Sequence, residues 1–164
     1  MKIRYCALFI ALVFSLVFCL SCGQEYGILD YQKGDIFANC DVNGKWNVNI
    51  IKEGNTRSLE VISPSEMAGV VFTFDTDCTV KYDGLEVRMP NDKVRGIFTL
   101  CSIFDLDEGW VGAVSSDTLD TVSFNSENIC YTVTYNSVSL PERVIISGEF
   151  DFDITIKSLE IKSK

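Results

Sequence analysis

Residues 46–61 read WNVNIIKEGNTRSLEV, and this stretch carries the pattern that decides the fold. Its first half places apolar side chains at Trp46, Val48 and Ile50, with asparagines between them. A turn around Gly54 follows, and apolar residues then return at alternate positions. Alternation with a period of two is typical of a strand that buries one face and exposes the other. The stretch therefore predicts a β-hairpin with one apolar face.

The same alternation recurs along most of the chain, and turn signals such as Asp83-Gly84 and Asn136-Ser137 interrupt it. Besides this hairpin, the predicted strands cover residues 37–42, 70–75, 79–82, 85–89, 110–114, 119–124, 129–135, 144–147 and 152–161. About ten consecutive strands without an internal repeat predict a long antiparallel meander.

The spacing of apolar residues changes from that of a strand to that of a helix once, between residues 93 and 107. Apolar side chains there follow the spacing of one helix face, at Ile97, Leu100, Cys101 and Phe104. Asn91-Asp92 supplies an N-cap signal and Gly109 a stop. One helix is too narrow to cover a flat sheet of this size, so the sheet must curl. The predicted fold class is α+β: over residues 28–164, a single curved antiparallel sheet of about ten strands forms a half-barrel around one or two helices.

The first 21 residues, MKIRYCALFIALVFSLVFCLS, predict a secretory signal peptide. Lys2 and Arg4 form a short basic region, and a nearly continuous apolar run follows. The alternative, a transmembrane helix, needs about 20 apolar residues, whereas this run has 16 and no basic stop-transfer cluster follows it. We therefore expect residues 1–21 to be cleaved and the mature domain to lie outside the cytoplasm.

Leu20-Ser21-Cys22-Gly23 resembles the bacterial lipobox, in which a small residue precedes a cysteine that is lipidated on its sulfur. Cys22 is the predicted lipidation site, and residues 22–27 are a short tether to the outer face of the cytoplasmic membrane. The alternative is a secreted protein in which Cys22 is an ordinary thiol. The mature chain would carry 12 basic and 23 acidic side chains, a net charge of −11. Anionic lipids would repel it, so the lipid itself must hold it at the membrane.

Composition argues against several function classes. A formal charge of −9 leaves no basic surplus for neutralising phosphates, so we expect no nucleic-acid partner. The chain has no histidine, no glycine-rich phosphate loop and no serine in a nucleophile elbow. Acidic clusters occur at Asp75/Asp77, Asp105/Asp107/Glu108 and Asp151/Asp153. Solvated turns explain them more simply than catalysis or calcium binding does, and we expect no enzyme, metal or cofactor.

Four of the seven cysteines lie in the mature domain, at Cys40, Cys78, Cys101 and Cys130. In an extracytoplasmic protein they could form two disulfides in three connectivities. They could equally be buried free thiols, because a domain of this length needs no covalent staple. Cys101 favours the second alternative, since it lies on the apolar face of the predicted helix. We expect folding without a disulfide.

The order of elements is that of a known family. A short N-terminal helix, strands, the Ser63-Pro64…Gly69 interruption, more strands, the helix over residues 93–107 and further strands resemble the half-barrel of the lipoprotein carrier LolA and of LppX-type lipoproteins. The chain is similar in particular to small lipoproteins of clostridia-like, Gram-positive bacteria. The resemblance spans roughly residues 28–161 and implies that acyl chains or other apolar ligands bind between the curved sheet and the helices.

Alternate residues of a strand lie on the same face of the sheet, and this strand parity indicates which side chains face that space. The candidate ligand-binding residues are Phe72, Phe74, Tyr82, Val87, Tyr131, Val133 and Ile154. Side-chain filling of the same space is the alternative, because protein interiors are usually close-packed. Two functions follow: a membrane-anchored protein that binds a lipid or another apolar ligand, or an adaptor that has a closed core and binds a protein partner.

Overall fold

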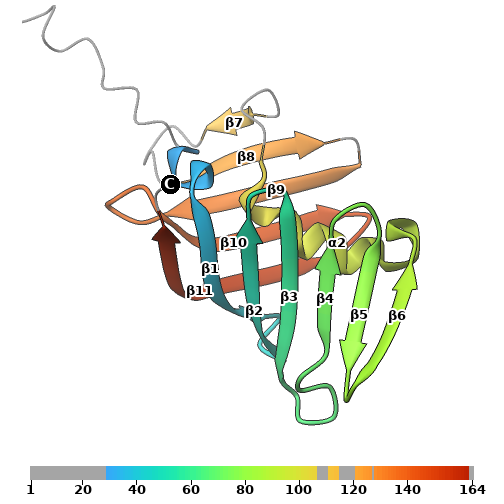
Figure 1. Cartoon of the computed structure of the whole chain (residues 1–164). Coiled ribbons are helices and arrows are strands. Elements are labelled where there is room, and N and C mark those ends of the chain that lie inside the picture. Colours follow the sequence, from blue (N-terminus) through green and yellow to red (C-terminus); the bar gives the residue numbers. More distant parts are fainter. Residues whose placement is uncertain (1–28, 107–110, 115–120, 127, 163–164) are drawn as a thin grey trace, which may run out of the picture.

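A computed structural model describes residues 29–106, 111–114, 121–126 and 128–162. They form one antiparallel sheet in the order β6-β5-β4-β3-β2-β1-β11-β10-β9-β8-β7. The strands are β1 (Asp35–Val42), β2 (Trp46–Glu53), β3 (Thr56–Ser63), β4 (Val71–Phe74), β5 (Cys78–Tyr82), β6 (Leu85–Met89), β7 (Val111–Val114), β8 (Thr121–Ser126), β9 (Ile129–Tyr135), β10 (Pro141–Gly148) and β11 (Phe152–Lys162). This curved sheet confirms the predicted fold class (Figure 1). The predicted signal segment 1–21 and tether 22–27 lie outside the described residues.

The first strand, β1, follows a 3₁₀ turn η1 (Asp30–Lys33) and lies near the centre of the sheet, and one half of the sheet is completed before the other. Strands β1 to β6 follow one another outward to one edge. The connection η2 (Asn91–Val94), α2 (Arg95–Cys101) and η3 (Ser102–Phe104) then leads toward the opposite edge, from which β7 to β11 return to the centre. Figure 1 shows α2 in the hollow between the two halves. The long connection between β6 and β7 therefore places α2 against the concave face of the sheet.

The strand registers gather the apolar positions on the concave face that carries α2, which we call the inner face. Directly paired residues share a face of a sheet, and Leu59 pairs with Ile50, which pairs with Ala38. All three are at most 1% exposed. Bulges at Asn39/Cys40 between β1 and β11, and in three further ladders, increase the local twist. Parity and bulges together let the sheet curl around its own core.

The predicted helix over residues 93–107 is correct in its buried face but wrong in its extent. Only α2 is α-helical, and 3₁₀ turns flank it on both sides. Pro90 occupies the N-cap position of η2, and the Asn91 side chain donates to the Thr76 carbonyl oxygen at 3.4 Å. Gly96 and the β-branched Ile97, Thr99 and Ile103 lower helix propensity here, so packing rather than propensity holds the segment. No helix within the described ranges is long and apolar enough to span a membrane.

Candidate functional site

An apolar cavity of about 180 Å³ lies between the inner face and α2. Its lining comes from the sheet on one side and the helix on the other: Val42, Asn43, Trp46, Val48, Leu59, Ile97, Leu100 and Phe152. Asn43 is the one polar residue in that lining. Its backbone N–H donates to the carbonyl oxygen of Asp153, and its Oδ1 accepts from the Asp153 N–H, each at 2.7 Å. The asparagine is thus engaged in a turn, and the cavity offers an apolar surface.

The position of α2 over this cavity depends on a close contact with the turn between β10 and β11. A Cβ on Gly96 would meet the Phe150 ring at 3.4 Å and the Phe152 ring at 3.8 Å. These two rings stack with their centroids 6.2 Å apart, and Arg95 pairs with Glu149 at 2.6 Å. Even a Cβ at Gly96 would be in ordinary van der Waals contact with the rings, so the helix backbone passes close to them. Phe152 consequently forms one wall of the cavity.

A second apolar surface continues the inner face beyond the helix, along β4, β5 and β6. Phe72 pairs with Leu59 of the cavity lining on one side and with Val80 on the other, and Val80 pairs with Val87. Exposure rises along this row: Phe72 and Val80 are half-buried, whereas Val87 is 54% exposed. Tyr82 and Leu85 lie beside it and are 45% and 71% exposed. We call these five residues the apolar strip.

The seven sequence-predicted ligand residues all lie on the inner face, as strand parity predicts, but the structure does not bring them together. Phe74, Tyr131, Val133 and Ile154 are at most 4% exposed and belong to the closed core. Phe72, Tyr82 and Val87 belong to the apolar strip. None of the seven lines the cavity. Cys22 lies outside the described residues.

Sequence reasoning missed the residues that do line the cavity, although the pattern contained part of the signal. Trp46 and Val48 belong to the alternation of the first hairpin, and Ile97 and Leu100 to the predicted helix face. A sequence pattern says which face a side chain occupies. It does not say over which strands the helix lies, and this position decides where the cavity is.

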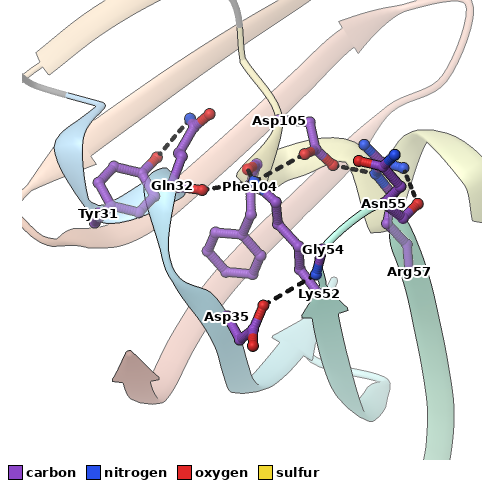
Figure 2. A network of polar contacts seen from close by, with 9 residues as sticks. All are labelled: Tyr31, Gln32, Asp35, Lys52, Gly54, Asn55, Arg57, Phe104 and Asp105. Atoms are coloured by element: carbon purple, nitrogen blue, oxygen red, sulfur yellow. Dashed lines mark hydrogen bonds and ion pairs between the residues drawn. The ribbon is translucent and has the colours of Figure 1, made fainter. Parts of the chain in front are cut away.

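The opposite end of β2 is closed by a network of charged side chains, drawn in Figure 2. Lys52 Nζ lies 3.0 Å from Asp105 Oδ1 and donates to the carbonyl oxygens of Gln32 at 2.7 Å and Phe104 at 3.1 Å. Arg57 Nε donates to the other Asp105 oxygen. That hydrogen bond raises the pKa of Arg57 above its usual value, although partial burial opposes the shift. The network ties η1 and η3 to the β2–β3 hairpin.

Aromatic rings fill the space next to this network. Tyr31 contacts Phe104 edge-on at a centroid distance of 6.4 Å and Tyr135 at the same distance. Burial raises the pKa of Tyr31. The half-barrel is therefore packed shut at the end where β2 finishes. The cavity lies at the other end, beside the turn between β1 and β2.

In two of the acidic clusters singled out in the sequence, one carboxylate has basic partners. Asp105 holds Lys52 and Arg57, and Asp153 holds the exposed Arg143, which donates to both of its oxygens. The hydrogen bond from Arg143 lowers the pKa of Asp153. Within the described ranges, no three cysteine or acidic side chains lie close enough to hold a metal ion.

Cys40, Cys78, Cys101 and Cys130 are free thiols. The first three are buried, and Cys101 is 0% exposed, which confirms its predicted place on the apolar helix face. Cys130 is half-buried. Desolvation raises the pKa of Cys40 to about 12 and also raises the pKa of Cys101. These buried thiols therefore hold little of the reactive thiolate at neutral pH.

We expect a maleimide at neutral pH to modify Cys130 first, and Cys40 and Cys101 only as fast as the domain unfolds. Timed labelling followed by peptide mass spectrometry measures each rate. A reductant should leave the melting temperature within a few degrees of its original value, because the four cysteines of the described domain are free thiols. Labelling of Cys40 at the rate of Cys130 in the folded protein would contradict this expectation, as would a large loss of stability on reduction.

Comparison with solved structures finds several similar chains. An uncharacterized conserved protein from Thermus thermophilus superposes with a TM-score of 0.51 and 10% identity, over 87% of this chain and 90% of its own. The two proteins share a fold. A LolA superfamily protein from Nitrosomonas europaea matches with a TM-score of 0.39 and 9% identity, over 84% of this chain and 93% of its own. No family model and no curated protein sequence match the chain.

Proposed function

We propose that this protein is a membrane-anchored extracytoplasmic lipoprotein that binds a lipid or another apolar ligand on the inner face of its half-barrel, without catalysis. One observation carries the proposal: the cavity under α2 adjoins the apolar strip through the Leu59–Phe72 pair. Together they offer a partly open apolar cavity and an exposed apolar approach to it. The resemblance of the sequence to LolA and LppX-type lipoproteins implies the same class of ligand.

The size of the cavity limits what part of a ligand it encloses. Pockets for drug-sized molecules measure roughly 300–1,000 Å³, whereas an apolar cavity of about 150 Å³ holds a molecule such as benzene. At about 180 Å³, this cavity fits the end of one acyl chain rather than a whole lipid. The remainder of the chain would lie along the apolar strip.

Displacement of a fluorescent fatty acid tests the proposal. Ile97 lines the cavity from the helix and is half-buried, so Ile97→Trp should fill the space with little cost to folding. We expect this variant to bind the probe at least about tenfold more weakly, the loss of about 1.4 kcal/mol of binding free energy. Ile62→Trp is the matched control, because Ile62 is 40% exposed and alternates with the inner-face residue Val61.

Two results would overturn the ligand-binding proposal. One is that wild-type protein binds no lipid probe at micromolar concentration, and the other is that the two tryptophan variants lose affinity equally. The adaptor function would then take its place. One observation already favours that alternative: Phe74, Tyr131, Val133 and Ile154 close most of the inner face, while apolar side chains at β5 and β6 remain exposed as a protein partner would require.

The anchor is a separate part of the proposal and rests on Cys22 after the apolar run. Lipidated there, the chain would have a tether of about five residues before the domain, at most ~18 Å when extended. Cys22→Ala is expected to move the protein from the membrane fraction to the soluble fraction, while Cys130→Ala should not. Retention of the Cys22→Ala protein at the membrane would show that the anchor lies elsewhere.

A further inference from the structure

Strand β6 forms one edge of the sheet, and within the described residues no other strand pairs with its outer side (Figure 1). The strand reads LEVRM, and its first four residues are exposed. Leu85 and Val87 project from the inner face, at 71% and 54% exposure. An exposed edge with unpaired backbone groups is a template for pairing with another strand.

The turn before β6 shows which backbone groups are available at this edge. Asp83 and Gly84 both have positive φ, 47° and 78°, as the two-residue turn of a tight hairpin requires. Tyr82 and Leu85 flank this turn, so they exchange backbone hydrogen bonds with each other. Since such pairs alternate along an antiparallel ladder, Val87 and Met89 also point their N–H and C=O groups at β5. Glu86 and Arg88 therefore direct theirs to the open edge.

We propose that β6 pairs in antiparallel fashion with β6 of a second copy of this chain, about a two-fold axis at Val87. In this register Glu86 lies opposite Arg88 of the second copy, and Arg88 opposite its Glu86. These are the residues with outward backbone groups, so each such pair exchanges two hydrogen bonds. Both pairs are also opposite in charge. Arg88 has no ion-pair partner within the described part of its own chain.

The two neighbouring registers of this strand pair are less stable. Centring the axis on Glu86 sets two carboxylates against each other, and centring it on Arg88 sets two guanidinium groups together and places Pro90 opposite Glu86. Like charges opposite each other destabilise a strand pair, and proline has no N–H to donate. Charge and backbone polarity thus select the same register, in which Val87 meets its own copy.

This pairing also joins apolar surface on the inner face. Leu85 would lie opposite Met89 of the second copy, so the apolar strips of the two chains would meet across the axis. One five-residue strand buries less than the ~1,200 Å² of a standard interface, so the dimer is weak and depends on concentration. Confinement to a membrane surface would raise that concentration.

Cysteine cross-linking in cells that produce the full chain tests the register. Val87 pairs with its own copy in a non-hydrogen-bonded position, where the Cα atoms lie about 4.5 Å apart, within the range of a disulfide. Two copies of residue 85 would be about 13 Å apart along the strand, beyond that range. Under mild oxidation, Val87→Cys should give at least about tenfold more covalent dimer than Leu85→Cys. Leu85 is the more exposed, so random collision predicts the reverse.

A second experiment exchanges the charges at positions 86 and 88. In the Val87→Cys background, Glu86→Arg alone and Arg88→Glu alone should each reduce the dimer several-fold, and the two together should restore it. All these positions are exposed, so circular dichroism should show an unchanged fold. Equal cross-linking at residues 85 and 87, or failure of the double exchange to restore what the single ones remove, would overturn the proposal. The wild-type chain is the control that measures cross-linking through the native cysteines.

Discussion

Gly148→Ala is expected to lower the free energy of unfolding by at least about 3 kcal/mol. Gly148 has φ 118°, and a Cβ there would lie 2.0 Å from the backbone oxygen of Asn128 and 3.1 Å from its carbonyl carbon. Backbone atoms cannot rotate away as a side chain can. The β8–β9 turn or the end of β10 would have to move, and the Glu149 N–H donates to that same oxygen.

Gly69→Ala is the matched control, because Gly69 also has positive φ, 85°, but no atom lies within 4 Å of its Cβ position. Alanine there should cost only the conformational penalty, about 1–2 kcal/mol. Urea unfolding followed by tryptophan fluorescence measures both variants. Losses of equal size would show that conformation, and not the contact with Asn128, limits position 148.

The same substitution bears on the candidate site. Gly148 precedes the turn that holds Glu149 and Phe150 and leads to Phe152 at the start of β11, and this segment contacts α2 at Arg95 and Gly96. A displaced turn would move Phe152, which lines the cavity. Folded Gly148→Ala protein is therefore expected to bind a lipid probe more weakly, while Gly69→Ala protein should bind it as wild type does.

The architecture could be predicted from the sequence because consecutive strands pair with each other both before and after the helical connection. Alternation gives the face of each side chain, and turn residues such as Asp83-Gly84 set the register of each hairpin. When each strand pairs with the next one in the sequence, few other strand orders are possible. The pairing of β1 with β11 is the exception, since residues 35–42 and 152–162 are far apart in the sequence and meet because β7 to β11 return from the opposite edge to the centre.

The site could not be predicted to the same degree, because it depends on how a short connection packs. Residues 93–107 show a helical period, but their described part forms one short helix with 3₁₀ turns, which contacts the rest of the chain through the Arg95–Glu149 ion pair and through Phe98 against Phe74. Phe74 illustrates the consequence: parity correctly places it on the inner face. There Phe98 of α2 covers its ring at a centroid distance of 5.4 Å, which leaves it in the core.

Lys52→Met is expected to lower the free energy of unfolding by about 2–3 kcal/mol, the range for removing hydrogen bonds to a charged group. Methionine keeps the length of the chain but removes the contacts with Asp105 and with the carbonyl oxygens of Gln32 and Phe104. The side chains of Lys52 and Asp105 are only 12% and 18% exposed. The substitution therefore leaves a largely buried carboxylate with Arg57 as its remaining partner.

Lys157→Met is the matched control for this prediction. Lys157 Nζ lies 3.1 Å from Asp41 Oδ2, nearly the same distance, but the two side chains are 47% and 29% exposed. Surface ion pairs contribute at most about 1 kcal/mol, so this variant should lose much less stability. Urea unfolding compares the two, and similar losses would show that burial adds nothing to the Lys52 network. The Lys52 network lies at the end of β2 opposite the cavity. Folded Lys52→Met protein should therefore keep wild-type affinity for a lipid probe. Unchanged affinity would show that the network stabilises the fold and takes no part in binding.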